Sequence, residues 1–200
     1  GAGAALSGAM TVSDNDNTAV AATELSTIGG ATSGTVTVTH AVAISGTASE
    51  LKAALVTPAS TVDVSDATVT ISDGDNTSIA ASDLSDIGSA TTGTVTVTNA
   101  INVTGTADQA VVALHTAGSR VEVTDAVVTL SDDPDLTELK QLNAATTGAI
   151  KINTQSKTYS GSTSDLAAAL AGTVTNGAGA ALSGAMTVND GDNTAVAATD

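Results

Sequence analysis

Aspartate pairs with an adjacent amide are the strongest candidates for chemistry in this sequence. The motif Asp-x-Asp-Asn recurs, with one degenerate version, and its members are Asp14, Asp16 and Asn17; Asp73, Asp75 and Asn76; Asp132, Asp133 and Asp135; and Asp190, Asp192 and Asn193. Carboxylate and amide oxygens are the hard donors that Ca²⁺ prefers, and a complete site needs about six to eight of them. The spacing therefore predicts a calcium site that neighbouring segments would complete. The alternative is a turn without metal, because Asp, Asn and Gly are good turn formers.

The few basic residues suggest a contact surface. Three of the five, Lys140, Lys151 and Lys157, lie close together in the sequence, and the single tyrosine, Tyr159, is beside them. In a chain of net charge −16, these side chains could meet the acidic face of a neighbouring copy. We therefore predict self-association into a polymer or bundle through this segment. Sequence drift in one part of the chain is the alternative.

Other residue types indicate no catalytic site. The chain has no cysteine, which excludes thiolate metal sites, and its two histidines, His40 and His115, recur at no equivalent position. Neither a GxSxG nucleophile elbow nor a phosphate-binding loop occurs. We expect no enzyme activity and no cofactor other than calcium. The TVTVT segments raise ice binding as a further alternative, although threonine is ordinarily a good strand former.

The acidity of the chain bears on its partners. Asp and Glu number 21 against 5 Lys and Arg in 200 residues. Nucleic acids and anionic membrane surfaces are polyanions that such a chain would repel. No apolar run reaches the roughly 18 residues of a membrane-spanning helix. We expect neither a nucleic-acid partner nor membrane insertion.

Internal repeats position the candidate residues. Residues 1–24 and 177–200 differ at only three positions, so the sequence repeats after 176 residues. Within that period, the segment that starts at Ser13 recurs 59 residues later at Ser72, and a degenerate copy that lacks about four residues starts at Ser131. We expect one continuous tandem-repeat segment, 1–200, with units at approximately 11–69, 70–128 and 129–186 and the start of a further copy at 187–200.

A weaker symmetry divides each unit into halves of about 30 residues, each with strand, corner, strand and short helix. The TVTVT segments at 35–39 and 94–98 alternate with period two, as strands with one buried face do. Thr47 precedes Glu50 by three residues and Thr106 precedes Gln109 by three, which is the spacing of a helix capping box. Helices should therefore begin directly after Thr47 and Thr106.

A half-unit cannot bury its own apolar side, whereas stacked coils bury a continuous one. Stacked strands lie about 4.8 Å apart, but a helix is about 10 Å wide, so long helices would not keep step with the strands. We therefore predict a mainly β, parallel β-solenoid with short helical turns. A curved strand–helix solenoid is the first alternative, and separate 59-residue domains are the second.

The segments ISGTASELKAAL, TVTVT and SDGDN resemble those of giant repetitive bacterial surface proteins, including cyanobacterial ones. The resemblance implies an extracellular or cell-surface location and a structural role in a filament, fibre or surface coat. A calcium-rigidified adhesin stalk or binding module is the alternative. The calcium-binding nonapeptide of one subclass does not occur in this sequence. Because the chain starts and stops within one unit, we expect it to continue into a longer polymer or to pair with a next copy.

Overall fold

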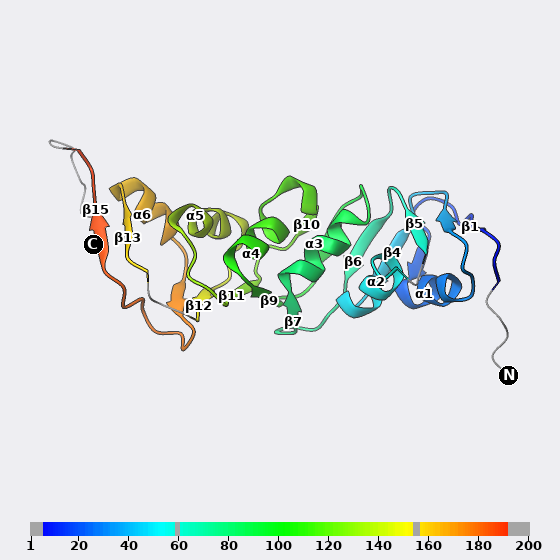
Figure 1. The fold of residues 1–200 in the computed structure, drawn as a ribbon, viewed down its shortest axis with the longest axis horizontal. Helices are drawn as coiled ribbons and strands as arrows, with labels where there is room; N and C mark the ends of the chain where they lie inside the picture. Colours follow the sequence, from blue (N-terminus) through cyan, green and yellow to red (C-terminus); the bar gives the residue numbers. More distant parts are fainter. Residues whose placement is uncertain (1–5, 59–60, 154–156, 192–200) are drawn as a thin grey trace.

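The computed structural model describes residues 6–58, 61–153 and 157–191. Coils of similar shape follow one another along the long axis, with β1 and β15 at opposite ends (Figure 1). Of the described residues, 30% are helical and 28% are in strands. One cluster of buried side chains extends from Val20 to Ala169, so the 59-residue units share a single core.

Each coil contains one helix, and consecutive helices contact one another along the stack. The α-helices of the described residues are α1 (Ala22–Gly30), α2 (Ala48–Leu55), α3 (Ala81–Ser89), α4 (Ala107–Leu114), α5 (Leu136–Ala145) and α6 (Thr163–Ala169), and a 3₁₀ helix, η1, spans Ala117–Ser119. Their buried residues are mostly alanine and leucine, such as Leu25, Leu51 and Leu84, none of which has any exposed surface. Small side chains on these faces let neighbouring helices pack closely.

The strands form parallel sheets in which neighbouring strands come from successive coils, and each inner strand pairs with the coil before and the coil after it. Strands β1 (Met10–Val12), β3 (Val36–Val38) and β5 (Val62–Val64) form the first sheet. The second contains β2 (Ala19–Ala21), β4 (Ala43–Gly46), β6 (Thr68–Ile71), β8 (Val95–Val97) and β10 (Val121–Glu122). The third contains β7 (Ser78–Ala80), β9 (Asn102–Gly105), β11 (Val127–Leu130), β12 (Ile150–Ile152) and β14 (Val174–Asn176), and the fourth pairs β13 (Tyr159–Gly161) with β15 (Met186–Val188).

Alternation along the strands builds the core, as the sequence predicts. In β3, Val36 and Val38 are buried while Thr37 between them is exposed, and β8 repeats this pattern. Like residues lie side by side across coils: Val36 pairs with Val62, and Ile44 pairs with Val69. Stacked branched side chains leave little space for aromatic rings, which accounts for the narrow core of this nearly aromatic-free chain.

The prediction of a mainly β solenoid with short helical turns is wrong. The fold is mixed α/β, and its α-helices have about two to three turns, from 7 residues in α6 to 10 in α5. The sheets are staggered along the stack, which accommodates the difference between strand spacing and helix width. Helix α3, for example, follows β7 of the third sheet and precedes β8 of the second. Because no sheet of the described residues exceeds five strands, the mismatch does not accumulate along the stack.

The degenerate third unit differs from the others by one strand. Helices α1 and α3 directly follow the strands β2 and β7 and have alanine at the N-cap, Ala21 and Ala80. In the third unit, α5 starts at Leu136 with Asp135 as its N-cap, and residues 131–135 form no strand. The shortened sequence thus lacks the strand that precedes the helix in the other units. A side-chain cap, Asp135, stands at the start of the helix instead.

Candidate functional site

The first aspartate of an acidic corner binds the helix of the preceding coil. Oδ2 of Asp73 accepts a hydrogen bond from the backbone N–H of Ala48 at 2.7 Å, and Oδ1 of Asp132 accepts one from Ala107 at 2.8 Å. Ala48 and Ala107 are the first residues of α2 and α4. The amides at a helix N-terminus lack intrahelical partners and carry partial positive charge. Each carboxylate therefore caps a helix that lies one coil away.

The same contact occurs again at the C-terminal end of the stack. Both carboxylate oxygens of Asp190 lie 3.1 Å from the backbone N of Thr163, the first residue of α6, and the Thr163 hydroxyl also donates to Asp190. Asp14 is the equivalent residue of the first corner, and among the described residues it accepts no hydrogen bond. Its carboxylate instead lies at the edge of an open groove.

The second aspartate of the corner binds the following coil. Oδ1 of Asp16 accepts from the N–H of Ala41 at 3.1 Å, and Oδ1 of Asp75 accepts from Ala100 at 3.2 Å. The adjacent asparagines have left-handed backbone, with φ of 59° at Asn17 and 61° at Asn76. Asparagine tolerates this region better than most residues, which explains its place in the turn.

These contacts change the interpretation of the acidic corners. The predicted calcium ligands Asp16, Asp73, Asp75, Asp132 and Asp190 accept hydrogen bonds from backbone amides of other coils, and Asp135 caps α5. Asp192 and Asn193 lie outside the described residues. No group of three or more acidic or histidine side chains that could hold a metal ion is found in the described part of the chain. Calcium binding remains a prediction.

The four predicted contact residues do not form one exposed group. Tyr159 is only 7% exposed, so the prediction that it is a surface contact is wrong. Burial, followed by the nearby charges of Asp133, Glu138 and Asp135, raises the pKa of Tyr159 to about 12. The Tyr159 side chain thus packs within the core of its own chain.

The lysines have separate environments. Nζ of Lys140 in α5 lies 2.5 Å from Oδ1 of Asp165 in α6, and this hydrogen bond lowers the pKa of Asp165. Lys151 is half-buried between Ile150 and Ile152, and Lys157 is exposed, with Nζ 3.5 Å from the backbone oxygen of Asp133.

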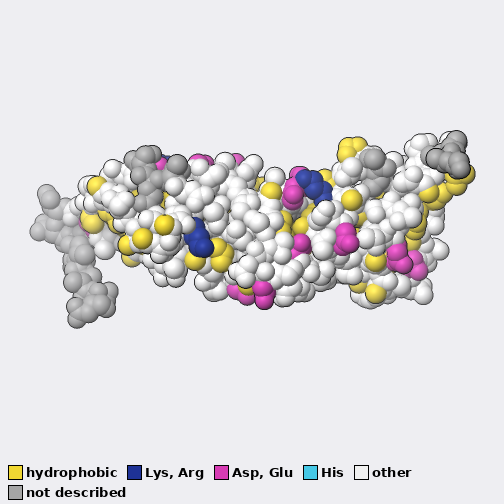
Figure 2. Space-filling model, turned by 90° about the horizontal axis from the view of Figure 1, so that it is seen from below, with side chains coloured by type: hydrophobic (Ala, Val, Ile, Leu, Met, Phe, Trp, Pro, Cys, Tyr) yellow, Lys and Arg dark blue, Asp and Glu magenta, His cyan; other side chains and the backbone are white. Residues whose placement is uncertain are grey.

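An equivalent ion pair joins Lys52 of α2 to Asp83 of α3. Lysine and arginine side chains are scattered rather than clustered on the face seen in Figure 2. Lys140 thus acts within the chain, as a link between coils.

Sequence analysis missed a recurring Thr-x-Gly motif at the corner after α1, α3 and α5. Thr91 is 4% exposed, and its hydroxyl donates to the backbone oxygen of Ala67 at 2.6 Å while accepting from the N–H of Gly93 at 3.0 Å. Thr32 with Gly34, and Thr146 with Gly148, repeat this arrangement. A Cβ at Gly93 would lie 2.3 Å from the Ala67 oxygen, so only glycine fits there. The regular recurrence of Thr-x-Gly in the sequence could have indicated this corner.

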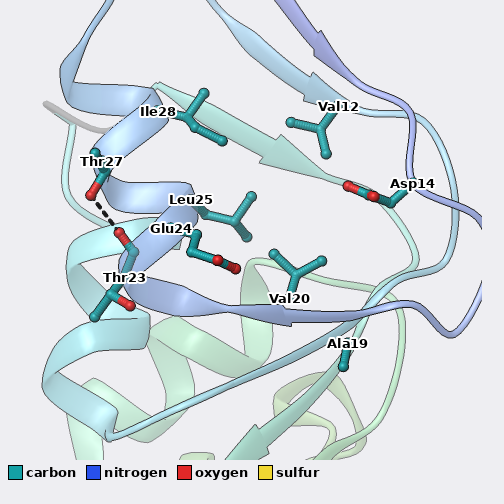
Figure 3. Close-up of a pocket in the computed structure, with 9 residues that line it drawn as sticks. All are labelled: Val12, Asp14, Ala19, Val20, Thr23, Glu24, Leu25, Thr27 and Ile28. Carbon is teal, nitrogen blue, oxygen red and sulfur yellow. Dashed lines mark hydrogen bonds between the residues drawn. The ribbon is translucent and has the colours of Figure 1, made fainter.

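An open groove of about 710 Å³ lies between β1, β2 and α1. Val12, Val20, Leu25 and Ile28 point into it, and the carboxylate of Asp14 borders it (Figure 3). The lining also contains the carboxylate of Glu24 and the side chains of Thr23 and Thr27, so apolar and acidic groups meet in this groove.

Comparisons of the chain with models of protein families, with curated proteins and with solved structures found no match. In the described part of the chain, no helix has both the length and the apolar character needed to cross a membrane.

Proposed function

We propose that this chain is a structural repeat segment of an extracellular bacterial filament, fibre or surface coat. The observation that carries the proposal is that the two aspartates of one acidic corner accept hydrogen bonds from the preceding coil and from the following coil. Asp73 reaches back to Ala48 and Asp75 reaches forward to Ala100, and both kinds of contact recur in other units. Contacts of each unit with its nearest neighbours alone build a body that extends along one axis.

The composition supports a structural role outside the cell. The chain combines no cysteine with abundant serine and threonine and a net charge of −16. A strong negative charge keeps a repetitive protein soluble and discourages nonspecific contact between parallel rods. Its resemblance to giant repetitive bacterial surface proteins favours the same location.

Localisation on the producing cells tests this proposal. Antibodies raised against the 200-residue chain should label filaments or a continuous coat on intact cells in immunoelectron microscopy. Protease treatment of intact cells should remove the label while an intracellular marker protein survives. Label that appears only after the cells are permeabilised would contradict the proposal.

A further inference from the structure

We propose that a hollow in the second unit binds one neutral sugar ring. The hollow has a volume of about 280 Å³ and lies between residues 92–94, at the corner before β8, and residues 114–122, which join the end of α4 to β10. Described coils precede and follow both segments, so the hollow does not depend on the first or the last coil. This binding activity goes beyond the proposed structural function and does not rest on it.

The groups that could hold a ligand are specific to the second unit. His115 stands where the first unit has Val56, and Arg120 stands where it has Thr61. Two neutral positions thus carry an imidazole and the only arginine of the chain, and both line the same hollow. Their placement together indicates a ligand site at this point rather than a feature of every repeat.

The backbone and a hydrogen bond fix Arg120 at the hollow. Its φ of 55° lies in the left-handed region, which residues other than glycine seldom adopt. Nη1 donates to the backbone oxygen of Thr92, in the other wall, at 2.7 Å. A guanidinium has five N–H donors, and within the described residues this is the only hydrogen bond that the Arg120 side chain makes. The remaining donors are available to a ligand.

Packing behind residues 114–122 keeps this wall of the hollow in place. Ser119 is only 5% exposed, and a Cβ at Gly88 of α3 would overlap its backbone oxygen. The N–H of Ser119 donates to the backbone oxygen of Thr116 at 2.9 Å, and the N–H of Thr116 donates to that of Val111 at 3.1 Å. A wall that is already ordered loses little conformational entropy when a ligand binds.

The lining combines a group that only donates hydrogen bonds with one that only accepts them. Arg120 precedes β10 and Glu122 lies in it, and both are exposed while Val121 between them is buried, so the two side chains lie on one face of the strand. The guanidinium only donates, and the carboxylate only accepts. A sugar hydroxyl does both, so adjacent hydroxyls can bind the two groups at once. The hydroxyls of Thr94 and Thr116 add further donors and acceptors.

The charges of the lining favour a neutral ligand. An anion that approached Arg120 would also meet the carboxylate of Glu122, and the net charge of −16 would repel it further. A cation would meet the Arg120 guanidinium. The volume lies just below the usual range of small-ligand sites, about 300–1,000 Å³, so the hollow suits one ring rather than a longer chain. A neutral hexose unit meets all of these conditions.

Nuclear magnetic resonance of the full chain tests the proposal with the methyl glycosides of glucose, galactose and mannose. At least one of them should shift the amide signals of residues 92–94 and 114–122, whereas the equivalent residues 33–35 and 61–63 of the first unit should not respond. The methyl uronide of the same sugar, which adds a carboxylate, should cause smaller shifts at the same concentration. Signals that move for none of the three glycosides, or that move equally for the uronide, would overturn the proposal.

Variants that introduce residues of the first unit provide matched tests. Arg120→Thr copies Thr61, which has an equivalent left-handed backbone with φ of 50°, so the fold should be kept. This variant should bind the glycoside at least about 10-fold more weakly, the usual effect of losing a hydrogen bond to a charged group. His115→Val should weaken binding by about 2-fold to 10-fold, as the loss of a neutral hydrogen bond does. Unchanged binding by Arg120→Thr would overturn the proposal.

Glu122→Gln tests the selectivity, because the amide keeps an acceptor oxygen and removes the charge. The uronide should bind this variant more tightly than it binds the wild type. Asp63→Asn, at the equivalent position of the first unit, should leave binding of the uronide unchanged. A uronide that binds Glu122→Gln no better than the wild type would overturn the assignment to neutral sugars. The immunolabelling of intact cells does not depend on any of these measurements.

Discussion

The two aspartates of an acidic corner bind in opposite directions along the stack. Asp73 caps α2 in the preceding coil, and Asp75 binds the N–H of Ala100 in the following coil. Gly74 separates the two aspartates, and Asn76 with its left-handed backbone follows them. The two aspartates whose spacing predicts a metal site thus join three successive coils.

At Asp73 we predict that the loss of one acceptor destabilises the whole stack. Asp73→Ala should lower the free energy of unfolding by about 0.5–2 kcal/mol, the usual cost of losing a helix cap. Asp73→Asn keeps a side-chain oxygen and should lose less. Urea unfolding followed by circular dichroism measures both. The exposed Asp63 provides a control, because Asp63→Ala should have little effect. Equal losses in all three variants would exclude a capping role.

Tyr159 should make the free energy of unfolding depend on pH in the alkaline range. Its pKa is raised to about 12 in the folded chain, chiefly by burial, so the unfolded chain loses the phenolic proton first. Stability should therefore fall as the pH rises from about 10, the ordinary pKa of tyrosine, towards 12. Urea unfolding at several pH values should show a steeper fall for wild type than for Tyr159→Phe. Parallel pH profiles for the two proteins would contradict this prediction.

At the scale of single elements, the sequence predicted where helices begin better than how the elements stack. The capping boxes at Thr47 with Glu50 and Thr106 with Gln109 are confirmed, and α2 and α4 begin at the next residue. These signals are local, so the sequence contains them in full. The staggering of strands between sheets depends on contacts between coils, which the 59-residue repeat does not specify.

The candidate site was predictable in the same partial way. Recurrence singled out the acidic corners, but their helix-capping partners lie a full coil away, as Asp132 and Ala107 do. The burial of Tyr159 was within reach of sequence comparison. It aligns with Ile44 and Val103, both of which are buried strand residues. The open groove was less accessible, because its lining depends on how β1, β2 and α1 pack against one another.

Calcium provides a test at the element scale, because bound ions would relieve repulsion between the clustered carboxylates at each corner. If calcium binds there, the melting temperature should be several degrees higher with calcium than with a chelator. Asp75→Asn should reduce that difference, and Asp63→Asn in β5 should leave it unchanged. Identical melting curves with calcium and chelator would leave the aspartates as structural caps alone.

For the whole molecule, nearest-neighbour contacts predict that length grows with repeat number while thickness stays constant. A chain with two consecutive 176-residue periods should have nearly twice the maximum dimension of one period and the same cross-section. Small-angle X-ray scattering, at concentrations low enough to keep the chains monomeric, measures both quantities. The third unit, which lacks one strand, is the place where bending should concentrate. A two-period chain that scatters as a compact particle, or as two beads on a flexible linker, would show that the coils do not form one continuous stack.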